Sequence, residues 1–269
     1  MAEHPTHRGR IRPAPENFLS EADIAAVKEG RRDFLRKALI TASAAVAAPG
    51  LARAAEGDPN ILTLPPWTTS LGQAVAARPY GLPSQYEKGL QRRESPGLTR
   101  MPQVSVAFTP LQGLFGIITP SGLHFERHHQ GWWDVDPAQH RLMINGMVKT
   151  SKVFTMDEIM RLPSVSRFHF IECGANTAVD WGNVAVPTCQ YTHGMLSCSE
   201  FTGVPLITLL EHAGADLKAA KFVLAEGADG SSMTRTIPMS LVTSGQVLVA
   251  YGQNGEMLRP ENGYPLRLV

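Results

Sequence analysis

Cys173 lies where an apolar stretch gives way to a loop of small residues, within FHFIECGANTA, residues 168–178. A thiolate is a soft ligand, so a cysteine at the end of a strand with small neighbours can approach a bulky metal centre. The sequence has no C-x-x-C pair that would bind zinc or act as a redox couple. A single protein thiolate would have to suffice, and this suits a metal that an organic cofactor already chelates.

Two other roles for Cys173 stay open at this level. The thiol could be a nucleophile that His169 or His193 activates, or it could be inert and buried. Because the chain has three cysteines, at least one is unpaired within it or binds something. Cys189 and Cys198 could form a disulfide across CQYTHGMLSC, or both could be small buried residues.

A second group of reactive side chains lies in LHFERHHQ, residues 123–130. His124 and His128 are four residues apart with Glu126 between them, but this H-x-E-x-H order is not the H-E-x-x-H of zinc peptidases. Gly122 and Gly131 bracket the stretch and argue against the long helix that such a site needs. A zinc hydrolase is therefore disfavoured.

Arg127 and His129 are alternate residues of the same stretch, so on an extended backbone they would point to one side. The planar fork of arginine suits oxyanions and phosphate, and histidine can add a donor. The two residues indicate an anion site, with a charged surface cluster as the alternative.

The composition is that of an ordinary globular protein: 269 residues, 43% hydrophobic and 18% charged. The formal net charge is +1 and no Lys/Arg run with interleaved aromatic residues is present, which argues against nucleic acid as a partner. Twenty prolines and 24 glycines favour a loop-rich protein with strands over a helical bundle.

Residues 1–54 have the features of a twin-arginine signal peptide: Arg31 and Arg32, a weakly apolar stretch, and an A-x-A site that ends at Ala54. An amphipathic helix with adjacent arginines is the alternative. The apolar stretch is shorter than the roughly 20 residues that span a bilayer, so no membrane span is expected. The signal predicts export in the folded state and a periplasmic location.

The rest of the chain divides into two parts. Residues 55–120 are rich in Pro, Gly and Thr and are predicted to form an extended arm, whereas residues 121–269 are more regular. Capping and periodicity predict helices at 155–163 and 202–214. The predicted strands are 141–146, 166–172, 220–226 and a hairpin at 246–258 that turns at Asn254-Gly255. Without a regular βαβ alternation, the fold class is α+β.

The order of several motifs resembles that of the molybdopterin sulfite oxidase family. HFERHH, RLMINGMV, FTMDEIMRLP, FIECGAN, FTGVPLITLLEHAG, EGADG, TIPM and VLVAYGQNGEMLRPENGYPLRLV follow one another from Gly122 to Val269. The resemblance implies a molybdopterin-binding catalytic domain of mixed sheets and short helices over residues 121–269. Because the sequence stops inside a predicted strand, this domain is expected to be incomplete, without the family's Ig-like dimerisation domain.

The resemblance also implies roles for individual residues. The cofactor would be molybdenum-molybdopterin, with Cys173 as the thiolate ligand of the metal. Arg127 would face the anionic substrate, and Asn262 stands where the family commonly has histidine. The residues expected at the cofactor are Phe125, Arg127, His129, Asp229, Asn262 and Arg267.

One departure from the family pattern bears on the substrate. Family members usually carry an arginine shortly after the cysteine, whereas this chain reads GANTAVDWG, with Thr177 and Ala178. Small dianions should bind less tightly to such a site, and a larger substrate that carries the sulfur at its tip is favoured. This departure is most similar to the molybdenum subunits (SoxC) of Sox-type sulfane dehydrogenases.

That likeness implies a hetero-oligomer with a c-type dihaem cytochrome, which accepts the electrons. The sulfur substrate would be attached to a carrier protein or be a small sulfur oxyanion. No C-x-x-C-H is present, so no covalently attached haem is expected in this chain. Sulfite dehydrogenase and methionine-sulfoxide reductase remain alternatives within the family, and an inactive fragment or partner-binding module remains one outside it.

Overall fold

The computed structural model describes residues 81, 83–94, 101–181 and 188–269. The predicted signal peptide and half of the predicted arm lie outside these residues. The chain separates into two compact units, residues 1–88 and 89–269. In the first, the one described element is the short helix η4 (Gln85–Glu87). No helix among the described residues has the length and apolar character needed to cross a membrane.

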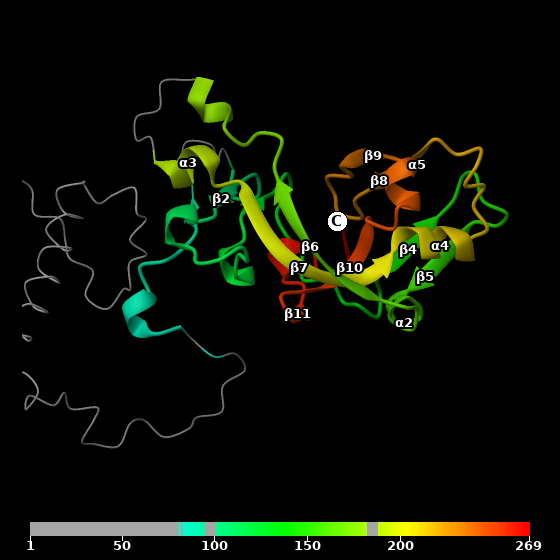
Figure 1. Ribbon diagram of the computed structural model, residues 1–269, viewed down its shortest axis with the longest axis horizontal. Coiled ribbons are helices and arrows are strands. Elements are labelled where there is room, and N and C mark those ends of the chain that lie inside the picture. Colours follow the sequence, from blue (N-terminus) through cyan, green and yellow to red (C-terminus); the bar gives the residue numbers. More distant parts are fainter. Residues whose placement is uncertain (1–80, 82, 95–100, 182–187) are drawn as a thin grey trace, which may run out of the picture. The chain divides into compact units, whose positions relative to one another are not determined.

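An antiparallel sheet of five strands forms the middle of the second unit (Figure 1). Four strands are neighbours in the order β11-β10-β7-β6, and β12 also pairs with β10. The strands are β6 (Val165–Glu172), β7 (Leu196–Pro205), β10 (Leu248–Gln253), β11 (Glu256–Met257) and β12 (Arg267–Leu268). β6 and β7 stay paired from Val165 opposite Gly203 to Glu172 opposite Leu196, and this long pair connects the two ends of the unit.

Three small antiparallel sheets flank this sheet, in the orders β1-β2-β3, β4-β5 and β8-β9. Their strands are β1 (Arg93–Glu94), β2 (Val106–Phe108), β3 (Glu126–Arg127), β4 (Arg141–Ile144), β5 (Lys152–Thr155), β8 (Phe222–Glu226) and β9 (Thr234–Pro238). The α-helices are α2 (Met156–Met160), α3 (Cys189–His193), α4 (Leu206–His212) and α5 (Met239–Thr243). Short 3-10 turns are η5 (Leu111–Gly113), η6 (Ser121–Leu123), η7 (Ala178–Trp181) and η8 (Pro260–Asn262). Antiparallel sheets with few short helices confirm the α+β class.

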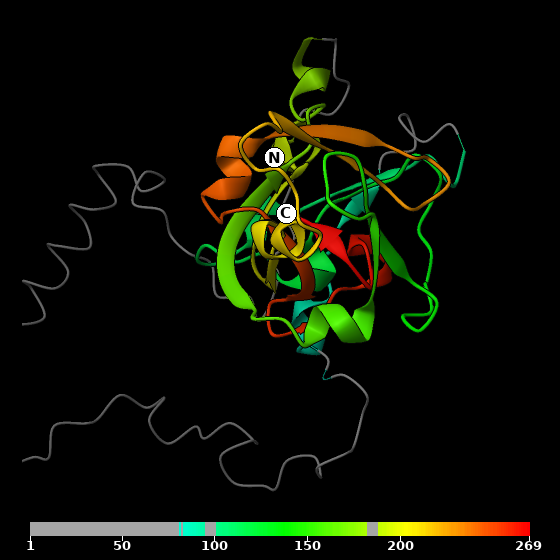
Figure 2. The same ribbon diagram turned by 90° about the vertical axis from the view of Figure 1, so that its right-hand side faces the viewer.

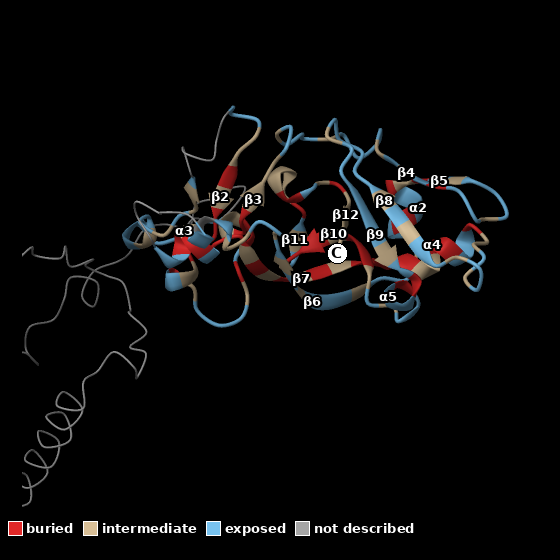
Figure 3. Ribbon diagram, turned by 90° about the horizontal axis from the view of Figure 1, so that it is seen from above, coloured by how far each residue is buried: buried red, intermediate tan, exposed pale blue. Residues whose placement is uncertain are grey.

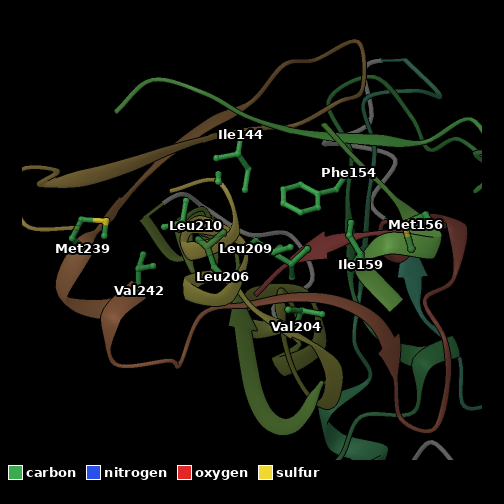
Figure 4. Packing of buried hydrophobic residues seen from close by; sticks show 12 residues of the cluster. Ile144, Phe154, Met156, Ile159, Val204, Leu206, Leu209, Leu210, Met239 and Val242 are labelled. Carbon is green, nitrogen blue, oxygen red and sulfur yellow. The ribbon is translucent and has the colours of Figure 1, made fainter. Parts of the chain in front are cut away.

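The largest hydrophobic core gathers where α4 packs on the end of β7 (Figures 3 and 4). Leu206, Leu209 and Leu210 recur on one face of α4, and Leu209 is fully buried. They pack with Val204 of β7 and Phe154 of β5, among other residues. Burial of each large aliphatic side chain contributes about 1.5–3 kcal/mol before entropy is counted. This core fixes one end of β7 independently of the other end.

Most predicted elements lie where the sequence placed them. The capping box is formed: Thr155 N donates to Glu158 Oε2 at 2.8 Å, and Glu158 N donates to Thr155 Oγ1 at 3.2 Å. Asn254 and Gly255 have φ of 51° and 79° at the turn between β10 and β11, as the hairpin prediction requires.

The helix predicted from residue 202 was wrong at its start. Residues 202–205 continue β7, whose pairing with β10 extends to Leu248 opposite Pro205. Sheet pairing outweighs the local pattern there, because Val204 is fully buried between the strands and the core. The helix begins at Leu206, with Pro205 as its N-cap.

Part of the segment predicted as an arm builds a sheet with Glu126 and Arg127. β1 pairs with β2, and β2 pairs with β3, which contains Glu126 and Arg127. β1 and β2 therefore support the strand on which the predicted anion site depends. Figure 2 shows the same ribbon turned by 90° about the vertical axis.

Candidate functional site

Cys173 directly follows the last residue of β6 in a turn that backbone hydrogen bonds close. Its N–H donates to the carbonyl oxygen of Met195 at 3.0 Å, and its carbonyl oxygen accepts from the N–H of Asn176 at 2.8 Å. Asn176 Oδ1 in turn accepts from Met195 N at 3.1 Å. The thiol is half-buried and free. These bonds tie the turn to the start of β7, so the cysteine is held at a fixed place.

The surroundings of Cys173 are apolar and come from distant segments. We call this group the cysteine cluster: the buried Val106, Phe108, Phe125 and Met195, with the partly buried Ile171, Cys173 and Tyr191 packed against them. Phe125 is 6% exposed, and its N–H donates to Ser197 Oγ at 3.1 Å. The structure thus brings together Cys173 and Phe125, two residues predicted from separate motifs.

Arg127 lies on the same side of its sheet as the cysteine cluster. In the register of β2 and β3, Arg127 is opposite Val106, a member of that cluster. Residues opposite one another on paired strands share a face. The Arg127 side chain is half-buried, and its guanidinium donates to the carbonyl oxygen of His128. His129, two residues further on, is exposed.

His124, which precedes β3 in the chain, is fully buried and holds a hydrogen-bond acceptor in its ring. Nδ1 lies 2.8 Å from the carbonyl oxygen of Phe125, which can only accept, so Nδ1 carries the proton. Burial, with the nearby charges of Arg267 and Arg92, lowers the pKa of His124 to about 3. The ring is therefore neutral, and its buried Nε2 is an acceptor without a partner in the described part of the chain.

Asn262 and Arg267 lie together near the end of the chain. The guanidinium of Arg267 donates to the carbonyl oxygen of Asn262 at 2.9 Å. Asn262 is 2% exposed; its Nδ2 donates to the carbonyl oxygen of Ser121 at 3.4 Å, and its Oδ1 has no partner among the described residues. Burial lowers the pKa of Arg267 to about 10, so the side chain stays cationic at neutral pH.

Asp229 lies in an exposed loop after β8, where Ser231 Oγ donates to both carboxylate oxygens at 2.9 Å. The loop approaches the segment that follows His129, because a side chain at Gly230 would collide with the side-chain oxygen of Gln130. In the described part of the chain, no hydrogen bond links Asp229, Asn262 or Arg267 directly to Cys173.

The positions of the cysteines and histidines bear on the other roles that the sequence left open for them, namely a disulfide, an activated nucleophile and a zinc site. All three cysteines are free; Cys189 is exposed and Cys198 half-buried, so they form no disulfide and are not both buried. His193 contacts Thr192 and Asp180 rather than Cys173. Among the described residues there is no group of three or more His, Cys, Asp or Glu that could hold a metal ion.

Sequence reasoning missed two residues beside the site. His124 was considered only as a zinc ligand, and its alternation with Glu126 and His128 was the available signal. Arg92 was not considered at all. It forms an ion pair with Glu126 and lies 3.8 Å from Glu261, and no sequence pattern links residues so far apart.

The residues present fit a molybdenum-pterin group. Cys173 offers a soft sulfur donor to a metal. The unpaired His124 Nε2 and Asn262 Oδ1 are buried acceptors of the kind that a pterin ring, rich in N–H donors, would satisfy. Arg267 is a cation able to pair with a phosphate.

Comparison with known proteins agrees with this chemistry. A family model described as "Oxidoreductase molybdopterin binding domain" matches residues 129–269. The chain is 33% identical over 168 residues to an NADH nitrate reductase of Volvox carteri, covering 58% of this chain and 19% of that protein. It is 31% identical over 170 residues to an NADPH nitrate reductase of Phytophthora infestans, covering 60% and 19%. The chain thus spans about a fifth of the length of these relatives.

Among solved structures, the chain is similar to the sulfane dehydrogenase SoxCD from Paracoccus pantotrophus. The two are 44% identical with a TM-score of 0.73, and the match covers 79% of this chain and 54% of that chain. The family match covers more than half of the residues and agrees with the motif order and the fold. The chain therefore belongs to the molybdopterin-binding oxidoreductases of the sulfite oxidase family.

Proposed function

We propose that this protein oxidises sulfane sulfur in the periplasm and passes the electrons to a c-type cytochrome. The observation that carries the proposal is the 44% identity to the sulfane dehydrogenase SoxCD, at a TM-score of 0.73. Because the match covers 54% of that chain, the activity, substrate and partner stand as proposals for this protein.

Each site residue has a separate role in this proposal. When bound, the molybdenum cofactor supplies two-electron oxygen-atom transfer. Cys173 would hold the metal through Sγ, and Arg127, on the same side of its sheet as the cysteine cluster, would stabilise negative charge on an anionic substrate. Phe125 packs beside the thiol and helps to exclude water. The acceptors of His124 and Asn262 orient the pterin.

The remaining predicted contacts hold the cofactor from outside the cysteine cluster. Arg267 would pair with its phosphate, and Asp229, in the loop that lies against Gln130, would add a contact. His129 adds a donor at the exposed end of the strand segment.

The loop after Cys173 favours a large substrate. Residues 174–181 contain neither lysine nor arginine, so this loop offers no cation to a small dianion such as sulfite. A sulfur atom at the tip of a carrier protein needs less charge there, because contacts elsewhere supply binding energy. A direct sulfite dehydrogenase and a methionine-sulfoxide reductase are the related alternatives.

Nitrate reduction is a second candidate, supported by identities of 31–33% to nitrate reductases. Those matches cover at most 60% of this chain, against 79% for the sulfane dehydrogenase, and their identity is lower. The sulfur substrate is therefore the better supported one.

The proposed location and partner come from the sequence. The twin-arginine pattern in residues 1–54 supports export, and the lack of C-x-x-C-H supports electron transfer to a separate c-type cytochrome in a hetero-oligomer.

The test is a substrate comparison on the cofactor-loaded protein. A persulfide on a carrier-protein cysteine, free sulfite, methionine sulfoxide and nitrate are each supplied, with horse-heart-type cytochrome c or reduced viologen as the redox partner. Rapid cytochrome c reduction with the persulfide alone is expected. Faster turnover of sulfite, methionine sulfoxide or nitrate would assign the corresponding alternative, and a protein that binds neither molybdenum nor pterin would be the inactive fragment.

Cys173→Ser should abolish turnover with the fold retained, because an alcohol is a harder and less donating ligand than a thiolate. Cys189→Ser is the matched control: that thiol is also free but exposed on α3, so activity should be unchanged. Circular dichroism checks the fold of both variants. Activity retained in Cys173→Ser would count against the proposal.

A further inference from the structure

The β1-β2-β3 sheet has two chemically different faces. Arg127 is opposite Val106 on β2, on the face of the cysteine cluster. Glu126 is opposite Ala107, which is in turn opposite Glu94 on β1. Because side chains alternate along a strand, Glu126 points to the face opposite Arg127. We call this the reverse face.

Glu126 is held on the reverse face through both carboxylate oxygens. Oε1 pairs with the guanidinium of Arg92, and Oε2 accepts from His128 Nε2 at 2.8 Å. The side chains of Glu126 and His128 are 14% and 13% exposed. Because this group is largely shielded from water, removal of one partner leaves a charge or a donor uncompensated. The loss of stability is then larger than at an exposed ion pair.

Arg92 extends this network to the segment that carries Asn262. Its second terminal nitrogen lies 3.8 Å from Glu261 Oε1 on η8, and the first donates to the carbonyl oxygen of His124 at 3.4 Å. The network of Arg92, Glu126, His128 and Glu261 therefore joins β3 to η8. These are the two segments on which the proposed contacts to substrate and pterin lie.

The backbone pairing of β3 is short. The strand is two residues long and pairs with β2 at two positions, and just beyond it His128 N donates to the carbonyl oxygen of Ser105 at 3.0 Å. The reverse face also has room for movement, because a cavity of about 380 Å³ adjoins it, lined in part by Arg92, Glu94, Ser105 and Glu126. The ion network adds side-chain contacts to this short backbone pairing.

We infer that Glu126 is the positioning residue for Arg127: anchored to Arg92 and His128, it keeps the Arg127 guanidinium on the cysteine face, where an oxyanion would bind. This inference takes the identity of the sulfur substrate from the proposed function. The contact between Arg127 and an anion does not depend on that function. Glu126 acts through Arg127 and does not touch the substrate.

The test measures anion binding and turnover on the cofactor-loaded protein, with sulfate as the binding probe in calorimetry. Glu126→Gln should weaken sulfate affinity and raise the KM for the sulfur donor about tenfold, the equivalent of one charge-assisted hydrogen bond. kcat should fall as well, because Arg127 stabilises charge that develops during the reaction, whereas the molybdenum content should change less than about twofold, since Cys173 is not touched. Glu126→Asp, which keeps the charge, should recover part of the loss.

Glu94→Gln is the matched control, because Glu94 lines the same cavity and carries the same charge but is not one of the partners of Arg92 or His128 in an ion pair. It should behave as the wild type. In an Arg127→Gln background, Glu126→Gln should have no further effect, because a positioning residue acts through the group that it positions.

Wild-type sulfate affinity in Glu126→Gln, a loss that persists in the Arg127→Gln background, or a wild type that binds no sulfate would overturn the inference. If the sulfate results hold but the persulfide is not oxidised, the proposed function fails and the role of Glu126 stands.

Discussion

At the scale of single residues, the site depends on buried polar atoms that the protein leaves unpaired. His124 Nε2 and Asn262 Oδ1 are buried acceptors without partners in the described part of the chain, although such groups normally find one. Leaving each unpaired costs about 1–3 kcal/mol. A bound pterin would offset this cost, so these two atoms are the strongest local sign of a ligand.

The lowered pKa of the buried His124 leads to a prediction about the stability of the protein in acid. Its pKa falls from 6.5 to about 3 on folding, so between these values the unfolded chain binds a proton that the folded chain does not. The free energy of unfolding is therefore highest above pH 6.5 and falls as the pH drops towards 3, by about 1.4 kcal/mol per pH unit from this residue.

Denaturant unfolding of wild type and His124→Asn at several pH values from 7.5 to 4 checks this. The variant should show a shallower loss of stability with acid, even if it is less stable at pH 7.5. Parallel curves would show that His124 titrates normally in the folded protein.

At the scale of elements, signals between residues close in the sequence were sufficient to predict structure. Contacts between residues far apart in the sequence could not be predicted from it. The capping box at Thr155 and the Asn254-Gly255 turn depend on residues close in sequence, and both are formed. The start of α4 was misplaced because β10 extends the pairing of β7 to Pro205. The proximity of Cys173 to Phe125, and of Arg92 to Glu126, depends on tertiary packing that no local pattern contains.

The pairing of β7 with β10 requires a residue without a side chain at Gly203. A Cβ there would overlap the backbone of Val249 and Ala250 on β10. Gly203→Ala must push the strands apart and should cost about 1–3 kcal/mol of unfolding free energy, as overpacking of a core does.

Gly174→Ala is the control for that variant, because no atom lies within 4 Å of the position a Cβ would take there. Its unfolding free energy should be that of the wild type. Equal stability of the two variants in thermal or denaturant unfolding would show that β7 and β10 are not in such close contact.

At the scale of the whole described unit, the largest hydrophobic core, here called the main core, and the cysteine cluster lie towards opposite ends of β6 and β7 (Figure 1). Val204, near one end of β7, belongs to the main core, whereas Met195, just before the other end, belongs to the cysteine cluster. The main core can therefore hold the long strands in place while the other end presents Cys173. For this reason changes at the thiol should alter chemistry without unfolding the protein.

The central claim is that the sulfur of Cys173 binds molybdenum. X-ray absorption at the molybdenum edge, recorded on the cofactor-loaded wild type, Cys173→Ser and Cys189→Ser, tests it most directly. The account predicts one sulfur neighbour fewer around molybdenum in Cys173→Ser than in the wild type, and no change in Cys189→Ser. The same number of sulfur neighbours in all three proteins, or a wild type without molybdenum, would contradict it.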